Sequence, residues 1–308
     1  MLVYLNRKPK SGPWGGGIKT VGMLYKSLID DGHEVTFKLD RPGIDILFCF
    51  DPRPNESGEW YQNFLDYRNN FGSKIVQRVG DIGTHSKPDL TNLVRTTIPL
   101  SDFVFHISDW AREKINSSND NEEVVYLAPP KMFYGSRKKD FKPGEKTKVI
   151  THHWSNNPKK GGNFYKKFDD FLKEDEEFEF TFMGRISPDV EFKNSTYISP
   201  QPASEVSYHL SNSHVYLTAS IEEAGGNHCV EALASGLPVI YHTSGGGIVD
   251  FCEDYGYGYS SFEEMIEKLK KTKENYPRLK SKVLEYDETL ESVCEQYVNT
   301  MKSLVKLC

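Results

Sequence analysis

Short apolar runs alternate with amphipathic segments along the whole chain, and this alternation restricts the fold more than any other feature. Runs such as "LVYLN" (2–6) and "DILFCF" (45–50) predict strands. The segment "IKTVGMLYKSLIDDG" (18–32) carries apolar residues at helical spacing and ends at a glycine, which predicts a helix. Strands separated by helices form parallel sheets covered by helices, so the sequence predicts an α/β fold.

The alternation occurs twice, once in each half of the chain. The expected strands lie at 2–6, 34–39, 45–50, 74–80, 102–108 and 123–130, and then at 148–154, 178–184, 195–199, 214–220 and 237–242. The expected helices lie at 18–32, 58–72, 87–100, 110–115, about 162–173, 205–211, 228–235, and from 261 onwards. Ser108 is the expected N-cap of the helix at 110–115.

A polar stretch at 135–147, "GSRKKDFKPGEKT", interrupts the alternation. Because 308 residues exceed what one core usually serves, we expect two doubly wound, Rossmann-like domains, at 1–140 and 141–308. Ligands of such sheets bind at the carboxyl ends of the strands. The expected site is therefore a central cleft between two facing domains.

Composition excludes several classes of function. A net charge of −6 and a pI of about 5.9 do not favour nucleic-acid binding. The basic run at 137–142 is interpreted as a solvated linker, so at most a peripheral membrane contact is expected.

No run of 18 apolar residues is present, and the apolar start is too short for a signal peptide. Scattered cysteines without a C-x-x-C pair argue against zinc or disulfides and favour a reducing, cytoplasmic location.

The most informative segment is "SIEEAGGNHCVEALASGLPVIYHTSGGGIVDF" (220–251), which follows an expected strand. Asn227 is the expected N-cap of the next helix, and a glycine loop at a helix N-terminus suits an anion. Glu231, one turn into that helix, suits a ribose diol, and Glu223 suits a second polyol. A phosphate site between two such carboxylates describes a nucleotide-diphosphate sugar. The alternative is a tight glycine turn before an ordinary buried helix.

This segment resembles the donor-binding region of the GT-B glycosyltransferases, specifically the large retaining family 4. Three further stretches are similar to that family: "GGGIKTVGMLYKSLIDDGHEVTF" (15–37), "NPKKGGNFYKKFDDFL" (157–172) and "SPQPASEVSYHLSNSHVYLTASIEEAGG" (199–226). The resemblance covers most of the chain, strongly at 148–250 and more loosely at 1–130. It implies an acceptor-side domain at 1–140, a donor-binding domain at 141–308, and a last helix that packs back on the first domain.

The resemblance also implies roles for single residues. Glu223 would lie by the donor sugar hydroxyls and the anomeric carbon, and Glu231 would bind the nucleotide ribose. Lys160 would neutralise the diphosphate leaving group, although a solvated lysine is the alternative in this lysine-rich stretch. The amides that would meet the sugar or the diphosphate are those of Gly225, Gly226 and Asn227, and His228 would contact the same groups. Backbone close to the diphosphate or acceptor is expected at Gly16 and Gly17.

Two positions depart from the family pattern. The arginine that usually lies five positions before the lysine is Ser155 here. Either Arg185 or Lys159 compensates for it, or the phosphate clamp is weaker. The usual histidine after the fourth strand is replaced by Gly80, and His85 on the same loop is the candidate for its acid–base or hydrogen-bonding role.

The expected function is therefore a retaining hexosyltransferase that uses a UDP- or GDP-sugar and a saccharide or lipid-linked acceptor. The chain has no D-x-D motif, so no metal and no cofactor beyond the donor are expected. Two alternatives remain open: a catalytically degenerate sugar-nucleotide-binding protein, and a GT-B epimerase or phosphorylase.

Overall fold

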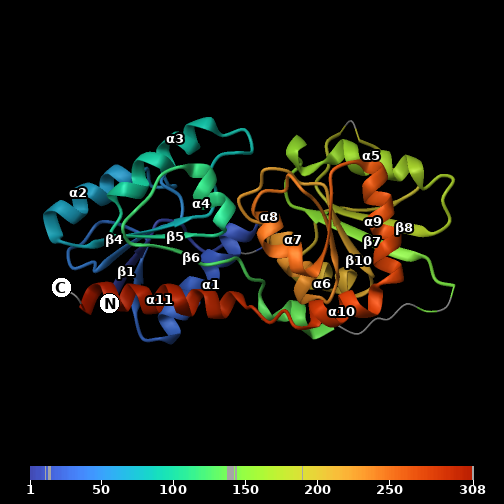
Figure 1. The fold of residues 1–308 in the computed structure, drawn as a ribbon. Coiled ribbons are helices and arrows are strands. Elements are labelled where there is room, and N and C mark those ends of the chain that lie inside the picture. The colour runs from blue at the N-terminus through green and yellow to red at the C-terminus, as the bar shows by residue number, and fades with distance from the viewer. Residues whose placement is uncertain (11, 13–14, 137–141, 143, 189, 307–308) are drawn as a thin grey trace. The chain divides into compact units, whose positions relative to one another are not determined.

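The computed structural model describes residues 1–10, 12, 15–136, 142, 144–188 and 190–306. The chain divides into two compact units. The first unit combines Met1–Leu127 with Thr289–Cys308, and the second unit is Ala128–Glu288. Each unit contains one six-stranded sheet whose strands are all parallel, with helices in the connections (Figure 1). The predicted α/β fold is thus confirmed.

The sheet of the first unit has the strand order β2-β1-β3-β4-β5-β6. Its strands are β1 (Leu2–Leu5), β2 (Glu34–Thr36), β3 (Ile46–Cys49), β4 (Lys74–Val79), β5 (Phe103–His106) and β6 (Glu122–Val124). Its helices are α1 (Gly16–Asp30), α2 (Tyr61–Phe71), α3 (Pro88–Thr97), α4 (Asp109–Ile115) and α11 (Leu290–Lys306). All four residues of β3 are fully buried, because helices cover both faces of this sheet.

The expected helix after Ser108 is present as α4, and the Ser108 hydroxyl accepts a hydrogen bond of 3.0 Å from the amide of Ala111. This confirms the predicted N-cap. The strand expected at 123–130 is shorter than predicted, because only Glu122–Val124 pairs with β5.

The last helix, α11, completes the first unit. It packs against α1, and Lys302 on α11 pairs with Asp31 at 2.7 Å. The ring of Tyr297 lies against Phe105, with ring centroids 4.5 Å apart. Its hydroxyl accepts a hydrogen bond of 3.2 Å from Arg78 Nε on β4. Helix α11 therefore buries aromatic surface of this sheet and satisfies a buried cation.

The sheet of the second unit has the strand order β12-β11-β10-β7-β8-β9. Its strands are β7 (Thr147–His153), β8 (Phe178–Gly184), β9 (Thr196–Ile198), β10 (Val215–Thr218), β11 (Val239–His242) and β12 (Gly256–Tyr259). Its helices are α5 (Gly162–Phe171), α6 (Ala203–Ser211), α7 (Asn227–Ala234), α8 (Gly247–Cys252), α9 (Phe262–Glu274) and α10 (Tyr276–Leu284).

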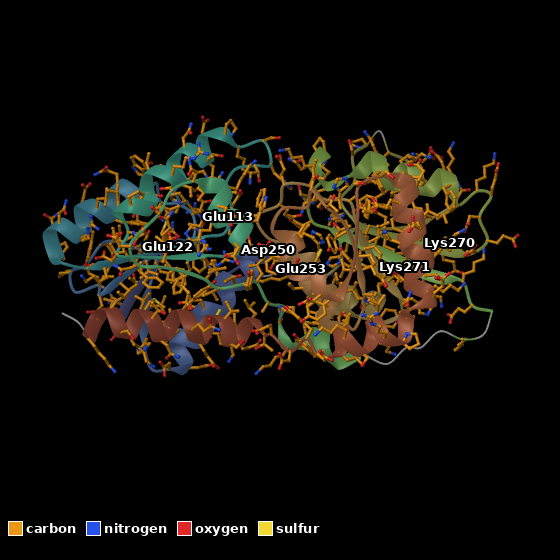
Figure 2. The ribbon with its side chains drawn as sticks, in the orientation of Figure 1. Glu113, Glu122, Asp250, Glu253, Lys270 and Lys271 are labelled. Atoms are coloured by element: carbon orange, nitrogen blue, oxygen red, sulfur yellow. The ribbon has the colours of Figure 1, made fainter. Side chains whose placement is uncertain are left out.

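The core of the second unit is rich in aromatic residues. Phe168 and Tyr165 of α5 pack on Phe180 of β8, with ring centroids 5.1 Å and 5.9 Å away. On the outer surface, Lys271 of α9 lies 5.0 Å from the ring centroid of Tyr257 on β12 (Figure 2). These contacts fix α5 and α9 on the sheet.

The units divide at 127/128, whereas the sequence prediction placed the division at 140/141. The last helix, which the resemblance led us to expect on the first domain, belongs to the first unit. Phe133 explains the earlier division, because it is fully buried and its carbonyl lies within reach of the Ser235 hydroxyl of α7, at 3.5 Å. Of the polar stretch in which the boundary was predicted, residues 137–141 and 143 lie outside the described residues.

Each sheet has a topological switch point. In the first unit, β2 lies on one side of β1 and β3 lies on the other. In the second unit, β8 lies on one side of β7 and β10 lies on the other. The loops that leave the carboxyl ends of two such strands diverge toward opposite faces of the sheet, which opens a crevice for ligands. Each switch point is a place to look for a binding site.

Candidate functional site

The candidate site lies at the carboxyl ends of β7 and β10, the switch point of the second unit. The loop after β7 reaches Lys160 through a short 3-10 turn, Pro158–Lys160, and the loop after β10 leads to α7. The two loops join where the amide of Ile221 donates to the carbonyl of Lys159 at 2.9 Å.

Gly161 makes this approach possible. Its φ is +82°, and a Cβ atom there would lie only 2.5 Å from Cβ of Ala219. Only glycine fits both the backbone conformation and the available space. The contact brings Lys160, next in sequence, to the loop that carries Glu223.

Lys160 and Glu223 form an ion pair through Nζ and Oε1. Their side chains are only 13% and 14% exposed, so the pair is largely removed from water. The second oxygen of Glu223 lies 3.2 Å from Nε2 of His228, at the start of α7. One carboxylate thus holds two basic groups, which come from different loops.

The second glycine cluster holds the backbone of Glu223. The Glu223 amide donates to the carbonyl of Gly245 at 3.1 Å, and the Gly247 amide donates to the Glu223 carbonyl at 2.8 Å. Gly246 has a φ of +74°, which permits this tight approach. The repeated glycines therefore dock the loop after β11 against the loop after β10.

The charges within this cluster reinforce one another. Burial alone would raise the pKa of Glu223, but Lys160 and His228 outweigh it and hold that pKa well below its usual value. Burial alone would lower the pKa of His228, but the neighbouring Cys229 and Glu223 raise it. Because burial also raises the pKa of the Cys229 thiol, that group is neutral and Glu223 is the charge that stabilises the imidazolium. Burial, His228 and Lys160 lower the pKa of His153, so this histidine is neutral.

Glu231, on the same helix α7, is 3% exposed and lies 2.9 Å from Nε2 of His152. Tyr216 connects the two histidines of the site. Its hydroxyl accepts from the His152 amide at 3.1 Å and lies 3.1 Å from Nδ1 of His228. His152 and Tyr216 are residues to which the sequence assigned no role. Their position in the sequence could have indicated a role, because each lies near the carboxyl end of an expected strand at the switch point.

A cavity of about 110 Å³ adjoins the cluster at the ends of β7 and β8. Its lining includes Lys160, Ser155 and Arg185. The Arg185 guanidinium stacks 4.0 Å over the ring of Trp154. Lys159 instead pairs with Glu222, outside the lining of this cavity. Of the two residues predicted to compensate for Ser155, it is therefore Arg185 that shares a cavity with Lys160.

The glycine-loop amides lie at the N-terminus of α7, where Gly225 and Gly226 precede the helix. The predicted N-cap was wrong by one residue, because Gly226 is the N-cap and Asn227 is the first residue of the helix. The loop packs too closely for a side chain here, since a Cβ on Gly226 would lie 2.8 Å from the Ile248 side chain. A glycine N-cap has no side chain, so no side-chain hydrogen bond caps this end of α7.

The remaining predicted residues lie in the first unit. Gly16 and Gly17 open α1, and His85 lies half-buried in the loop between β4 and α3. A Cβ on Gly80 would lie 2.2 Å from Nη1 of Arg78, so the arginine occupies that space. Among the residues that the structure describes, no group of three or more His, Cys, Asp or Glu side chains is arranged to hold a metal ion.

Residues 191–281, which include Glu223 and Glu231, match the family model described as glycosyl transferases group 1. The sequence comparison with curated proteins gave no match. The fold is that of solved GT-B enzymes. The chain thus has the GT-B fold, and its residues 191–281 are similar to the group 1 glycosyltransferases.

Three solved structures illustrate the similarity of the fold. Sucrose-phosphate synthase from Thermosynechococcus elongatus has a TM-score of 0.71 and 11% identity, over 100% of this chain and 99% of that one. Anabaena Alr3699/HepE in complex with UDP has a TM-score of 0.72 and 12% identity, over 98% and 99% of the chains. WaaG, a glycosyltransferase involved in lipopolysaccharide biosynthesis, has a TM-score of 0.67 and 15% identity, over 98% and 99%. At these identities the likeness shows the fold alone.

No helix within the described residues is both long and apolar enough to cross a membrane.

Proposed function

We propose that this glycosyltransferase moves a hexosyl group from a nucleotide-diphosphate sugar to a hydroxyl acceptor, with retention of configuration and without a metal ion. The observation that carries the proposal is the buried cluster of Lys160, Glu223 and His228 beside Glu231. It places a lysine, a histidine, two carboxylates and a helix N-terminus at one switch point. A nucleotide-diphosphate sugar requires groups of these kinds, for phosphate charge and for two sets of hydroxyls.

Glu231 is the proposed ribose ligand. A carboxylate accepts hydrogen bonds from both hydroxyls of a diol. His152 lies 2.9 Å from one oxygen of Glu231 and thereby fixes the orientation of the carboxylate. Because Glu231 is nearly buried, its hydrogen bonds to a ribose would form in a site of low polarity, where each contributes more than in water.

Lys160 is the proposed partner of the diphosphate leaving group. Negative charge develops on the leaving group as the glycosidic bond breaks, and a preorganised cation stabilises that charge. The amides of Gly225, Gly226 and Asn227 at the start of α7 add the positive end of a helix dipole. Arg185, in the cavity shared with Lys160, supplies the second cation. With these groups in place, the proposed reaction needs neither a metal nor a cofactor beyond the donor.

Donor binding would rearrange the ion pairs of the site. Lys160 is bonded to Glu223 in the structure, and a diphosphate would compete for it. Glu223 would then keep His228 as its partner and turn an oxygen toward the sugar hydroxyls. This exchange lets the buried carboxylate remain ionised before and after binding.

Two solved neighbours suggest which donor to try first. The titles of their structures describe Anabaena Alr3699/HepE in complex with UDP and glucose, and the pneumococcal O-GlcNAc transferase GtfA in complex with UDP and GlcNAc. A UDP-sugar is therefore the first candidate donor and a GDP-sugar the second. Retention of configuration rests on the sequence resemblance to the retaining family.

The test is thermal unfolding of the protein with UDP, GDP, ADP, CMP and their sugar conjugates. A ligand at 100 times its Kd stabilises the protein by about 2.7 kcal/mol. Glu231→Ala should abolish the stabilisation, whereas Glu205→Ala, on the exposed surface of α6, should preserve it. If no nucleotide stabilises the wild type at millimolar concentration, the proposed donor site is refuted.

Once the donor is known, two further experiments are possible. The anomeric proton signals of the product test whether the configuration is retained, and the activity of chelator-treated enzyme tests whether the reaction needs a metal ion.

A further inference from the structure

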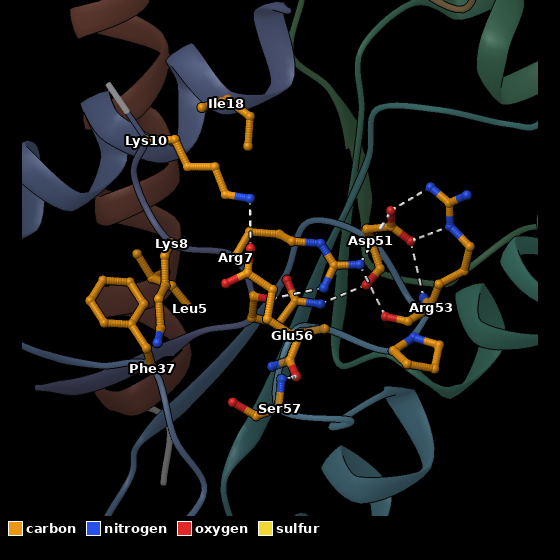
Figure 3. Close-up of a pocket in the computed structure, with 13 residues that line it drawn as sticks. Leu5, Arg7, Lys8, Lys10, Ile18, Phe37, Asp51, Arg53, Glu56 and Ser57 are labelled. Carbon is orange, nitrogen blue, oxygen red and sulfur yellow. Dashed lines mark hydrogen bonds and ion pairs between the residues drawn. The ribbon is translucent and has the colours of Figure 1, made fainter. Parts of the chain in front are cut away.

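The first unit has a cavity at its own switch point. It lies at the carboxyl ends of β1 and β3, and its volume is about 510 Å³ (Figure 3). Pockets of about 300–1,000 Å³ hold small ligands. The lining comes from residues 5–8 and 10 after β1, residues 51 and 53–57 after β3, Ile18 in the first turn of α1, and Phe37. We refer to it as the basic cavity.

The basic cavity is positively charged in a chain that is negatively charged overall. Among its described lining residues, four are basic and two are acidic, whereas the whole chain has a net charge of −6. The basic residues are Arg7, Lys8, Lys10 and Arg53. An excess of cations in a concave site raises the local concentration of anions.

Asp51 holds the two arginines in place. Arg53 binds the Asp51 carboxylate through Nε at 3.0 Å and Nη2 at 2.6 Å, and Arg7 Nη2 lies 3.3 Å from the same carboxylate (Figure 3). Arg7 also donates to the carbonyl of Arg53 at 3.0 Å. Two guanidinium groups on one carboxylate leave a net positive charge in a fixed geometry. Fixed guanidinium groups are well suited to carboxylates and phosphates.

Hydrogen bonds hold the two strand-end loops together. The Asn6 side-chain amide donates to the Asp51 carbonyl at 2.6 Å, and its oxygen accepts from the Phe50 amide at 2.8 Å. Asn55 donates to the hydroxyl of Tyr4 at 3.1 Å, and its own oxygen accepts from the Ser57 amide at 2.8 Å. The floor of the cavity is therefore fixed before any ligand arrives.

A group transfer needs two substrates. The proposed donor site occupies the switch point of the second unit, and the basic cavity occupies the corresponding place in the first. Lys10 and Glu56 pair at 2.6 Å on its rim, and Phe37 and Pro54 provide apolar surface. Polar groups beside an apolar surface suit a sugar ring, which has hydroxyls on its edge and C–H groups on its faces. Binding of a neutral sugar alone would not account for four basic side chains in the lining.

We propose that the basic cavity binds the acceptor, and that this acceptor is a saccharide carrying an anionic group, either a carboxylate or a phosphate. The assignment to the acceptor rests on the function proposed above. Arg53 and Arg7 would hold the anion, with Lys8 and Lys10 adding positive charge at the rim.

The test is ligand-observed saturation-transfer NMR on the full chain, which detects millimolar binding. The probes are D-glucuronate for a carboxylate, glucose 6-phosphate for a phosphate, and D-glucose as the neutral comparison. At least one anionic sugar should bind at least about tenfold more tightly than glucose, and the difference should shrink at high salt. Arg53→Gln and Lys10→Gln should each weaken that binding, by about tenfold for the arginine. Lys26→Gln, an exposed charge change elsewhere on α1, is the matched control.

The result that overturns the proposal is equal binding of glucose and both anionic sugars, or anion binding that Arg53→Gln leaves unchanged. Inorganic phosphate is a further arm, and because it carries no carbon-bound protons its binding is measured by the loss of the glucose 6-phosphate signal in competition. If it binds as tightly as glucose 6-phosphate with the same dependence on Arg53, the sugar contributes nothing and the acceptor assignment falls. Nucleotide stabilisation of the wild type is measured in parallel. If no nucleotide stabilises the wild type, the donor site is refuted while the result for anion binding stands. The two failures are therefore distinguishable.

Discussion

Replacing Lys160 by methionine should destabilise the second unit far more than the same change at Lys159. The two lysines are adjacent, and their partners Glu223 and Glu222 are adjacent as well. The side chains of the Lys160 pair are 13% and 14% exposed, whereas those of the Lys159 pair are 32% and 39% exposed. The two pairs differ mainly in burial.

Removing one partner of a buried ion pair costs about 3–5 kcal/mol, because the remaining charge stays out of water. Glu223 retains His228, so about 3 kcal/mol is expected for Lys160→Met. An exposed pair contributes about 0–1 kcal/mol, which is the expectation for Lys159→Met. For a unit of this size, 1 kcal/mol corresponds to about 2–4 °C in Tm. The expected decreases are thus about 6–12 °C for Lys160→Met and at most about 4 °C for Lys159→Met.

Scanning calorimetry at pH 7 measures the Tm of both variants. The Glu223→Gln background provides the control. There the extra cost of Lys160→Met should largely disappear, because the stranded charge is gone. Equal decreases for the two single lysine variants would refute the reasoning and make Lys160 an ordinary solvated lysine.

Two further predictions concern the same unit. The raised pKa of His228 means that its interaction with Glu223 stabilises the fold fully below about pH 6.5 and is lost as the pH rises through the folded-state pKa. The Tm difference between the wild type and His228→Gln should therefore be larger at pH 6 than at pH 9, and a difference independent of pH would contradict the pairing. Gly161→Ala should cost about 1–2 kcal/mol for its backbone conformation, plus the clash with Ala219. Gly144→Ala shares the positive φ but meets no atom within 4 Å, so calorimetry should show a smaller loss for it, and equal losses would exclude the clash.

Most strands could be predicted because their signals are local, but β12 (Gly256–Tyr259) was not among the expected strands. Central strands of a parallel sheet are buried on both faces and read as apolar runs, as in Ile46–Cys49 and Val215–Thr218. Helix positions followed equally from apolar spacing and from local hydrogen bonding, as at Ser108. These features depend on residues close in sequence.

The pairings within the site could not be predicted, because they join distant segments. Lys160 and Glu223 are 63 positions apart, and His152 and Glu231 are 79 apart. Both pairings depend on how closely two loops pack, which no periodicity encodes. The N-cap lies at Gly226 rather than at the predicted Asn227, and a Cβ on Gly226 would lie 2.8 Å from the Ile248 side chain, a contact with a distant segment that sequence spacing does not reveal.

The prediction of His152 would have required strand geometry. Successive residues of a strand point to opposite faces, so "HH" at the end of β7 places one histidine on each side. His153 lies with Thr151 and Tyr165 in the core, at 3.1 Å and 2.7 Å, and His152 faces Glu231. The pattern was visible in the sequence, but its meaning depended on α7.

The return of α11 to the first unit has a consequence for biosynthesis. On the ribosome, Met1–Leu127 emerges well before Leu290–Lys306, and the whole second unit is made in between. Until α11 arrives, Phe105 lacks the ring of Tyr297 and Arg78 lacks its hydroxyl partner. The nascent first sheet is thus exposed to aggregation and to chaperones, while the contiguous second unit can fold as soon as it is released. A message truncated just before residue 290 should, after release of the chain, yield a folded second unit attached to an incomplete first one.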